Sequence, residues 1–106
     1  MWIFSTSGIY STVQHRDDPE KVIIRARVKS DLVALNGIHH CGKIVRSPQA
    51  DYPFRIVASK LDWLCALHML GRRTTYPNFK SAIKDKRRHD LLLRIWRMLQ
   101  ELEVPR

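Results

Sequence analysis

The segment Phe54–Leu70 constrains the fold of this chain most, because it predicts a strand that runs directly into a helix. Apolar and polar residues alternate over Phe54–Ala58, which is typical of a half-buried strand. Residues Ser59–Asp62 follow with the pattern of a capping box, the motif that opens a helix. The next residues, up to Gly71, are apolar over more than half of a helical circumference. We therefore expect Phe54–Ala58 to be an inner strand and Lys60–Leu70 to be the core helix.

The first half of the chain predicts a similar order of elements. Met1–Gln14 is rich in β-branched and aromatic residues around a central glycine, so it predicts one long bent strand or two short strands. Val22–Val28 alternates as a strand with one wet face. Ser30 predicts the N-cap of a short helix that ends at Asn36-Gly37. With a further strand at Lys43–Arg46, the order approximates β-β-α-β-β-α.

The C-terminal residues predict further helix. Phe79 opens one apolar patch and Leu91 opens a second at helical spacing, but Lys84–Asp90 between them contains no apolar residue. A helix gains little from turns that bury nothing, so we expect two helices rather than one. At 106 residues the chain has an ordinary domain size. We predict a single α+β domain, residues 1–106, with a mainly antiparallel sheet and helices on one face.

The charge balance favours an anionic partner. The chain has 19 Lys+Arg against 10 Asp+Glu, which gives a formal net charge of +9. Nucleic acid is the most frequent partner of such a chain, because each neutralised phosphate releases condensed counterions. The alternative is that the charge serves solubility alone.

The first candidate binding surface is the face of the sheet opposite the helices. If the strands form one antiparallel sheet, three arginines project from it: Arg25, Arg27 and Arg55. Arg46 is a further candidate. A basic sheet face beside aromatic residues such as Trp2 or Tyr10 binds single strands, because bases stack on the rings and arginines hold the phosphates. The alternative is an ordinary solvated sheet face.

The second candidate binding surface is C-terminal. Four basic residues recur there at helical spacing: Lys80, Lys84, Arg87 and Arg88. If one helix continues through them, they predict a stripe that follows phosphates. Such a run is otherwise a solvated face or a hinge.

Two further groups of residues raise the question of metal binding or catalysis. His39, His40 and Cys41 with Cys65 and His68 would supply zinc ligands, but their spacing matches no standard zinc pattern, so we predict no metal and no cofactor.

Asp85, His89 and Asp90 are the catalytic candidates, since Asp85 at helical spacing would orient His89 as a general base. No nucleophile, glycine-rich phosphate loop or carboxylate cluster accompanies them. The alternative is that Asp85 and Asp90 neutralise neighbouring basic residues. We therefore assign no catalytic residue.

Several short motifs carry a resemblance to known proteins. They are MWIF with Gly8, Tyr10 and Val13-Gln14, then RARV, ADYP, YPNFK and RRHDL followed by Trp96. Together they cover most of the chain, which resembles a small uncharacterised family of bacterial proteins. The resemblance implies a single compact cytoplasmic domain and contributes no mechanism.

Composition also bears on location. Cys41 and Cys65 stand in an apolar or His-rich context, and no charged-then-apolar signal segment precedes them, so we expect free thiols and a reducing cytoplasm. No apolar run approaches the roughly 20 residues that span a bilayer, so we expect no membrane insertion.

Taken together, these features predict a small basic protein that binds RNA or single-stranded DNA and is not an enzyme. The alternative is a protein-interaction module, an inhibitor or accessory subunit, that docks through exposed aromatic residues such as Trp2 or Tyr76 on an acidic partner surface. An enzyme that acts on a phosphorylated substrate is the third hypothesis.

Overall fold

The computed structural model describes residues 1–105, and these contain one five-stranded sheet. The strands are β1 (Trp2–Phe4), β2 (Ile9–Gln14), β3 (Lys21–Ala26), β4 (Val45–Arg46) and β5 (Phe54–Ser59). Their order in the sheet is β1-β2-β3-β5-β4, and all neighbouring strands are antiparallel. The predicted α+β class with an antiparallel sheet is confirmed, and β5 is an inner strand as expected.

Helices alternate with these strands and then follow them. They are α1 (Lys29–Ile38), α2 (Lys60–Arg72), α3 (Phe79–Ala82), α4 (Lys86–Leu99) and a final 3-10 helix, η1 (Gln100–Glu103). The chain forms two compact units, Met1–Thr75 and Tyr76–Arg106. The first unit holds the sheet with α1 and α2, and the second holds α3, α4 and η1. That all 106 residues form a single domain stays a prediction.

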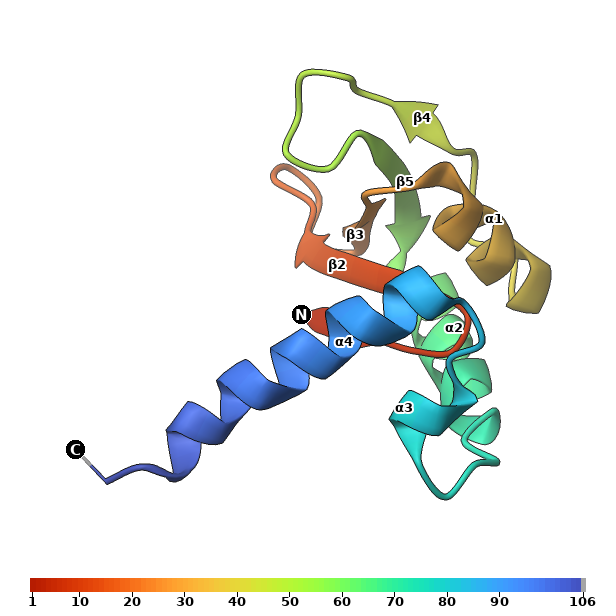
Figure 1. The fold of residues 1–106 in the computed structure, drawn as a ribbon. Coiled ribbons are helices and arrows are strands. Elements are labelled where there is room, and N and C mark those ends of the chain that lie inside the picture. The colour runs from red at the N-terminus through yellow and green to blue at the C-terminus, as the bar shows by residue number, and fades with distance from the viewer. Residues whose placement is uncertain (106) are drawn as a thin grey trace. The chain divides into compact units, whose positions relative to one another are not determined.

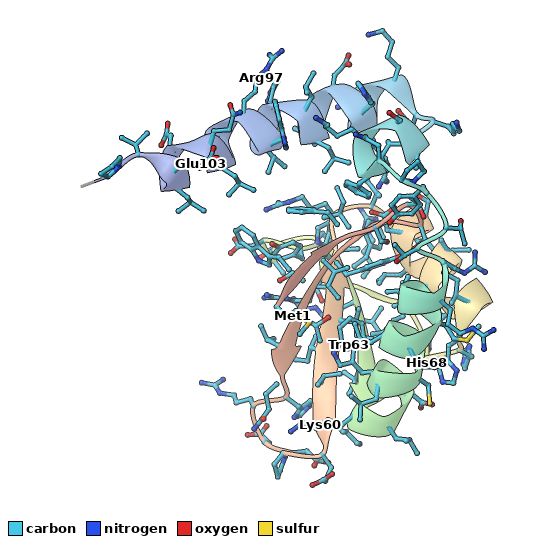
Figure 2. All side chains as sticks on the ribbon, turned by 90° about the horizontal axis from the view of Figure 1, so that it is seen from below. Met1, Lys60, Trp63, His68, Arg97 and Glu103 are labelled. Carbon is cyan, nitrogen blue, oxygen red and sulfur yellow. The ribbon has the colours of Figure 1, made fainter. Side chains whose placement is uncertain are left out.

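The core of the first unit lies between the sheet and its two helices (Figure 1). Because side chains alternate along a strand, Val22, Ile24 and Ala26 of β3 all point to the helices and are buried, as the sequence pattern predicts. Leu35 of α1 and Trp63 of α2 pack against them, and Figure 2 shows Trp63 between α2 and the strands. Both helices therefore cover one face of the sheet.

α2 packs in the core as expected, but it shares the core with α1 and buries less of its circumference than its apolar residues predict. Only Trp63 and Ala66 of α2 are buried, whereas Leu61 is 69% and Leu64 is 61% exposed. A helix that packs on a sheet buries the stripe of residues that recurs every three or four positions. Leu67 and Leu70 continue that stripe and pack against the core, whereas Leu61 and Leu64 lie outside it.

Of the two alternatives predicted for Met1–Gln14, the structure has two strands, because Ser5 N donates to the Gly8 carbonyl at 3.0 Å and closes a turn between them. The short helix predicted next has other bounds than expected. Ser30 is not the N-cap of α1, which begins after Val28 without a side-chain cap. The helix also continues through Asn36-Gly37 to Ile38.

The Asn36 side chain explains why α1 does not end where predicted. Its Oδ1 accepts a hydrogen bond from Cys41 N at 2.8 Å, and its Nδ2 donates to the Gly42 carbonyl at 2.9 Å. Asn36 therefore stays helical and fastens the loop that follows α1.

The predicted N-cap of α2 at Ser59 is confirmed, although within residues 1–105 no hydrogen bond joins the backbone N–H of Ser59 to the Asp62 side chain. Ser59 Oγ accepts a hydrogen bond from Asp62 N at 3.0 Å and also donates to Asp62 Oδ2 at 3.0 Å. The helix starts at Lys60 and passes Gly71 to end at Arg72. A local pattern thus fixes the junction between β5 and α2.

A buried polar junction ties α1 to β2. Tyr10 is 1% exposed, and its hydroxyl donates to the Asp31 carbonyl at 2.9 Å. Asp31 Oδ2 accepts a hydrogen bond from Ile9 N at 3.1 Å. A Cβ atom on Gly8 would lie 2.7 Å from the Tyr10 hydroxyl oxygen, so this position has room for glycine alone.

The second unit contains two α-helices, as expected. Asn78 Oδ1 accepts from Ser81 N at 3.0 Å and caps α3, while Asp85 Oδ1 accepts from Arg88 N at 3.2 Å and caps α4. Each helix therefore has its own start signal. Among residues 1–105, none of the helices combines the length and the apolarity that crossing a membrane requires.

Candidate nucleic-acid interface

The face of the sheet opposite α1 and α2, here called the open face, carries a row of side chains from five strands. The pairing register aligns Trp2 with Ser11, Ser11 with Arg25, Arg25 with Arg55, and Arg55 with Val45. Directly paired residues project from the same side of a sheet. Arg25 and Arg55 are therefore neighbours on the face to which the sequence pattern assigns them.

Arg25 and Arg27 are both positioned by one aromatic ring. The guanidinium carbon of Arg25 lies 4.7 Å from the centroid of the Tyr52 ring, and that of Arg27 lies 4.5 Å from the same centroid. Arg25 also donates from Nη2 to Ser11 Oγ at 2.7 Å and from Nε to the Ser11 carbonyl at 3.3 Å. Arg27 donates from Nη1 to the Asp51 carbonyl at 3.2 Å. Tyr52 thus gathers two guanidinium groups beside β5.

Arg55 completes what is here called the arginine cluster, which consists of Arg25, Arg27 and Arg55. Arg55 stands opposite Arg25 on β5, and its Nε is buried without a hydrogen-bond partner in the described part of the chain. Within residues 1–105, no member of the cluster forms an ion pair with a carboxylate. Like charges this close repel one another, so the arrangement favours an anion with several oxygen atoms.

Apolar side chains lie beside the arginine cluster on the open face. Trp2 is 72% exposed and belongs to the same row as Arg25. Val13, Ile23 and Val57 form a second row across β2, β3 and β5, and the two valines are exposed. An exposed indole in the same row as an arginine, with Ser11 between them, suits the stacking of a base.

Two residues expected on the open face lie elsewhere. Tyr10 is buried in the core, where it contacts α1, and so offers no ring to a ligand. Arg46 pairs with Phe54, whose side chain packs against the core, so Arg46 belongs to the side of the helices. Consecutive strand residues point to opposite faces, so a shift of one position along the strand moves a side chain from the open face to the side of the helices.

The C-terminal basic residues do not form the continuous stripe that their spacing predicts. They fall on different elements, with Lys80 on α3, Lys84 between the helices, and Arg87 and Arg88 on α4. The single helix that would align them is interrupted, because Asp85 caps a new one. Lys80 Nζ instead lies 3.7 Å from the centroid of the Trp96 ring. The continuous helix that the stripe requires is therefore not formed, in agreement with the two helices expected here.

The catalytic candidates near the start of α4 form local structural pairs. The Asp85 carboxylate accepts from Arg88 N and caps the helix, so it does not orient His89. Lys86 Nζ donates to Asp90 Oδ2 at 2.8 Å, and His89 Nδ1 lies 3.3 Å from Asp90 Oδ1. These contacts, that of Lys86 first, lower the pKa of the Asp90 carboxyl. Asp90 therefore neutralises a lysine, as the alternative interpretation holds.

Two residues of the zinc hypothesis, His39 and Cys41, form other contacts. His39 Nε2 lies 2.9 Å from Asp62 Oδ1, and Cys41 Sγ donates to the His39 carbonyl at 3.3 Å. Burial raises the pKa of the Cys41 thiol to about 11, which disfavours the thiolate that zinc binds. Among the described residues 1–105, no group of three or more His, Cys, Asp or Glu side chains has the arrangement of a metal site.

Sequence reasoning missed Tyr52 and Ser11 as parts of the candidate site. Tyr52 lies in the loop before β5, and Ser11 lies on β2, 14 residues from the Arg25 that it anchors. Their roles depend on which strands become neighbours. The residue type of Tyr52 was the one available clue, since an aromatic side chain close to strand arginines is a suitable partner for cation–π contacts.

The chain was compared with families and with individual proteins of known sequence or structure. No family model, no curated protein and no solved structure matches it. The bacterial family that its motifs resemble therefore stays a prediction.

Proposed function

We propose that this protein binds single-stranded nucleic acid, RNA or DNA, on its open face and is not an enzyme. The observation that carries the proposal is the arginine cluster, in which Arg25 and Arg55 are direct cross-strand partners and no carboxylate neutralises a member within residues 1–105. In this proposal the arginines contact phosphates and Trp2 stacks on a base. A cytoplasmic location stays part of the proposal.

The chemistry of the open face supports this assignment over a merely solvated surface. A solvated arginine gains nothing from a position opposite another arginine, because like charges directly opposite in a sheet are destabilising. An antiparallel sheet with an exposed aromatic residue and basic groups on one face, and helices on the other, is also the arrangement that single-strand binders use. The excess of positive charge over the whole chain would add non-specific attraction.

The test is the salt dependence of binding to an unstructured oligonucleotide of about 10 nucleotides. Fluorescence anisotropy gives the dissociation constant over a salt series that starts near 50 mM. We expect a log–log slope of about −0.7 for each phosphate neutralised. Arg25→Ala combined with Arg27→Ala should flatten the slope by about one unit or more, because each lost contact removes its counterion release.

A matched control distinguishes binding at the arginine cluster from attraction by the net charge of the whole chain. Arg72 and Arg73 are exposed at the end of α2, away from the open face, so Arg72→Ala with Arg73→Ala changes the net charge equally. This pair should leave the slope within about half a unit of the parent value. Lys84→Ala with Arg87→Ala tests the C-terminal surface in the same way. Absence of binding by the parent at about 50 mM salt would refute the proposal.

A protein-interaction module is the second candidate, and the apolar part of the open face favours it. Phe4 is 36% exposed, and it joins Trp2, Val13 and Val57 as apolar side chains open to a partner. Such a module would bind an acidic protein surface. The affinities for poly-glutamate and for an oligonucleotide of equal charge, measured at the same ionic strength, distinguish the two candidates. Tighter binding of the oligonucleotide supports the nucleic-acid proposal, since only nucleic acid supplies bases for Trp2, whereas equal or tighter binding of poly-glutamate supports the interaction module.

A further inference from the structure

We propose that the arginine cluster is a discrete site for one phosphate group, held ready by Tyr52, and that Tyr52 is a scaffold rather than a platform for bases. This inference rests on the proposed function, because it assigns the phosphate of a bound strand to Arg25, Arg27 and Arg55. It goes further in giving that phosphate a defined position on the sheet. The site accepts the phosphate of an oligonucleotide, a mononucleotide or the free ion.

Several hydrogen-bond donors of the arginine cluster have no partner within the part of the chain that the structure describes. A guanidinium group has five N–H donors. Arg25 uses Nε and Nη2 for Ser11, and Arg27 uses Nη1 for the Asp51 carbonyl. Arg55 Nε has no partner within residues 1–105. The remaining donors belong to residues that are neighbours on one face of the sheet, and a phosphate offers the oxygen atoms that paired, planar donors bind best.

The arginine cluster brings three positive charges together, and their mutual repulsion disfavours the cluster when no anion is bound. Arg25 and Arg55 are direct neighbours across the ladder, so their Cβ atoms are about 5 Å apart. Arg27 lies two residues beyond Arg25, on the same side of the chain, and contacts the same ring. An anion between the three groups would replace repulsion with attraction.

The contacts of Tyr52 determine where the base of a bound nucleotide can stack. Its ring already contacts two guanidinium groups, at 4.7 Å and 4.5 Å. These contacts fix the direction of Arg25 and Arg27 before a ligand arrives, which lowers the entropy cost of binding. The base must therefore stack elsewhere, and Trp2, in the same row and 72% exposed, is the ring available.

The experiment uses inorganic phosphate as the probe and thermal unfolding of the full chain as the readout. At constant ionic strength, replacing chloride with phosphate should raise the Tm of the parent along a saturable curve, because a ligand of the folded state stabilises it. Arg55→Lys keeps the charge but loses the planar fork of donors. This variant should lose the saturable shift and should bind the oligonucleotide about tenfold more weakly.

The matched control is Arg72→Lys, which makes the same chemical change at an exposed position on α2. It should respond to phosphate as the parent does. Tyr52→Phe retains the ring and should retain the shift, whereas Tyr52→Leu should weaken it. A mononucleotide should raise the Tm and its nucleoside should not. Circular dichroism establishes that each variant is folded before its response is compared.

The outcomes separate this inference from the proposed function. If phosphate produces no saturable shift while the parent still binds the oligonucleotide with a steep salt slope, the discrete site is refuted and nucleic-acid binding stands. Equal responses of Arg55→Lys and the parent refute it as well. If phosphate binds and Arg55→Lys abolishes the effect, but no oligonucleotide binds, the site stands and the nucleic-acid proposal fails.

Discussion

Leu35 and Leu64 form a matched pair of leucines that tests where the core of the first unit lies. Leu35 on α1 is 0% exposed, whereas Leu64 on α2 is 61% exposed. Truncating a fully buried leucine removes its transfer energy and leaves a cavity, so Leu35→Ala should cost about 2–5 kcal/mol of unfolding free energy. Leu64→Ala removes a side chain that is mostly in water, and its cost should stay within about 0.5 kcal/mol.

Urea denaturation followed by far-ultraviolet circular dichroism measures this difference. With an unchanged m value, the midpoint reports stability directly. At about 4–8 °C per kcal/mol, Leu35→Ala should also lower the Tm by roughly 8–40 °C. If Leu35→Ala matched the parent, or if Leu64→Ala cost more than about 2 kcal/mol, the arrangement of α1 and α2 over the sheet would be incorrect.

Two further predictions concern the polar contacts that hold the first unit together. Gly8→Ala should lower the free energy of unfolding by about 1–3 kcal/mol in urea titrations, because its Cβ would lie 2.7 Å from the Tyr10 hydroxyl oxygen. Gly37→Ala is the control, since no atom lies within 4 Å of its Cβ position, and it should not destabilise the protein. A destabilised Gly37→Ala variant would contradict the steric argument. Hydrogen bonds from His39 and Ser59 lower the pKa of the Asp62 carboxyl, so its contribution to stability is full above the unfolded value of about 4 and is lost as the pH falls through the lower folded value. The stability difference between the parent and Asp62→Asn should thus shrink below about pH 4 in urea titrations, and a constant difference would exclude this linkage.

The sequence alone determined those features that depend on residues close together in the chain. Alternation over Val22–Ala26 predicted which side chains enter the core, because strand residues point to opposite faces in turn. Ser59 and Asp62 predicted the start of α2, because a capping box needs residues only three positions apart. The charged run Lys84–Asp90 predicted a break between two helices, and the break lies at its start, whereas Lys86–Asp90 already belongs to α4.

Tertiary structure alone decided which residues meet across the sheet. Nothing local places Arg25 opposite Arg55, or Ser11 beside Arg25, because strand order and register arise from packing between distant segments. The same reason explains Leu64: an apolar helix shows which side chains are able to be buried, but only the surface against which it packs selects the stripe that is buried. The arginine cluster is therefore visible only once β3 and β5 are paired.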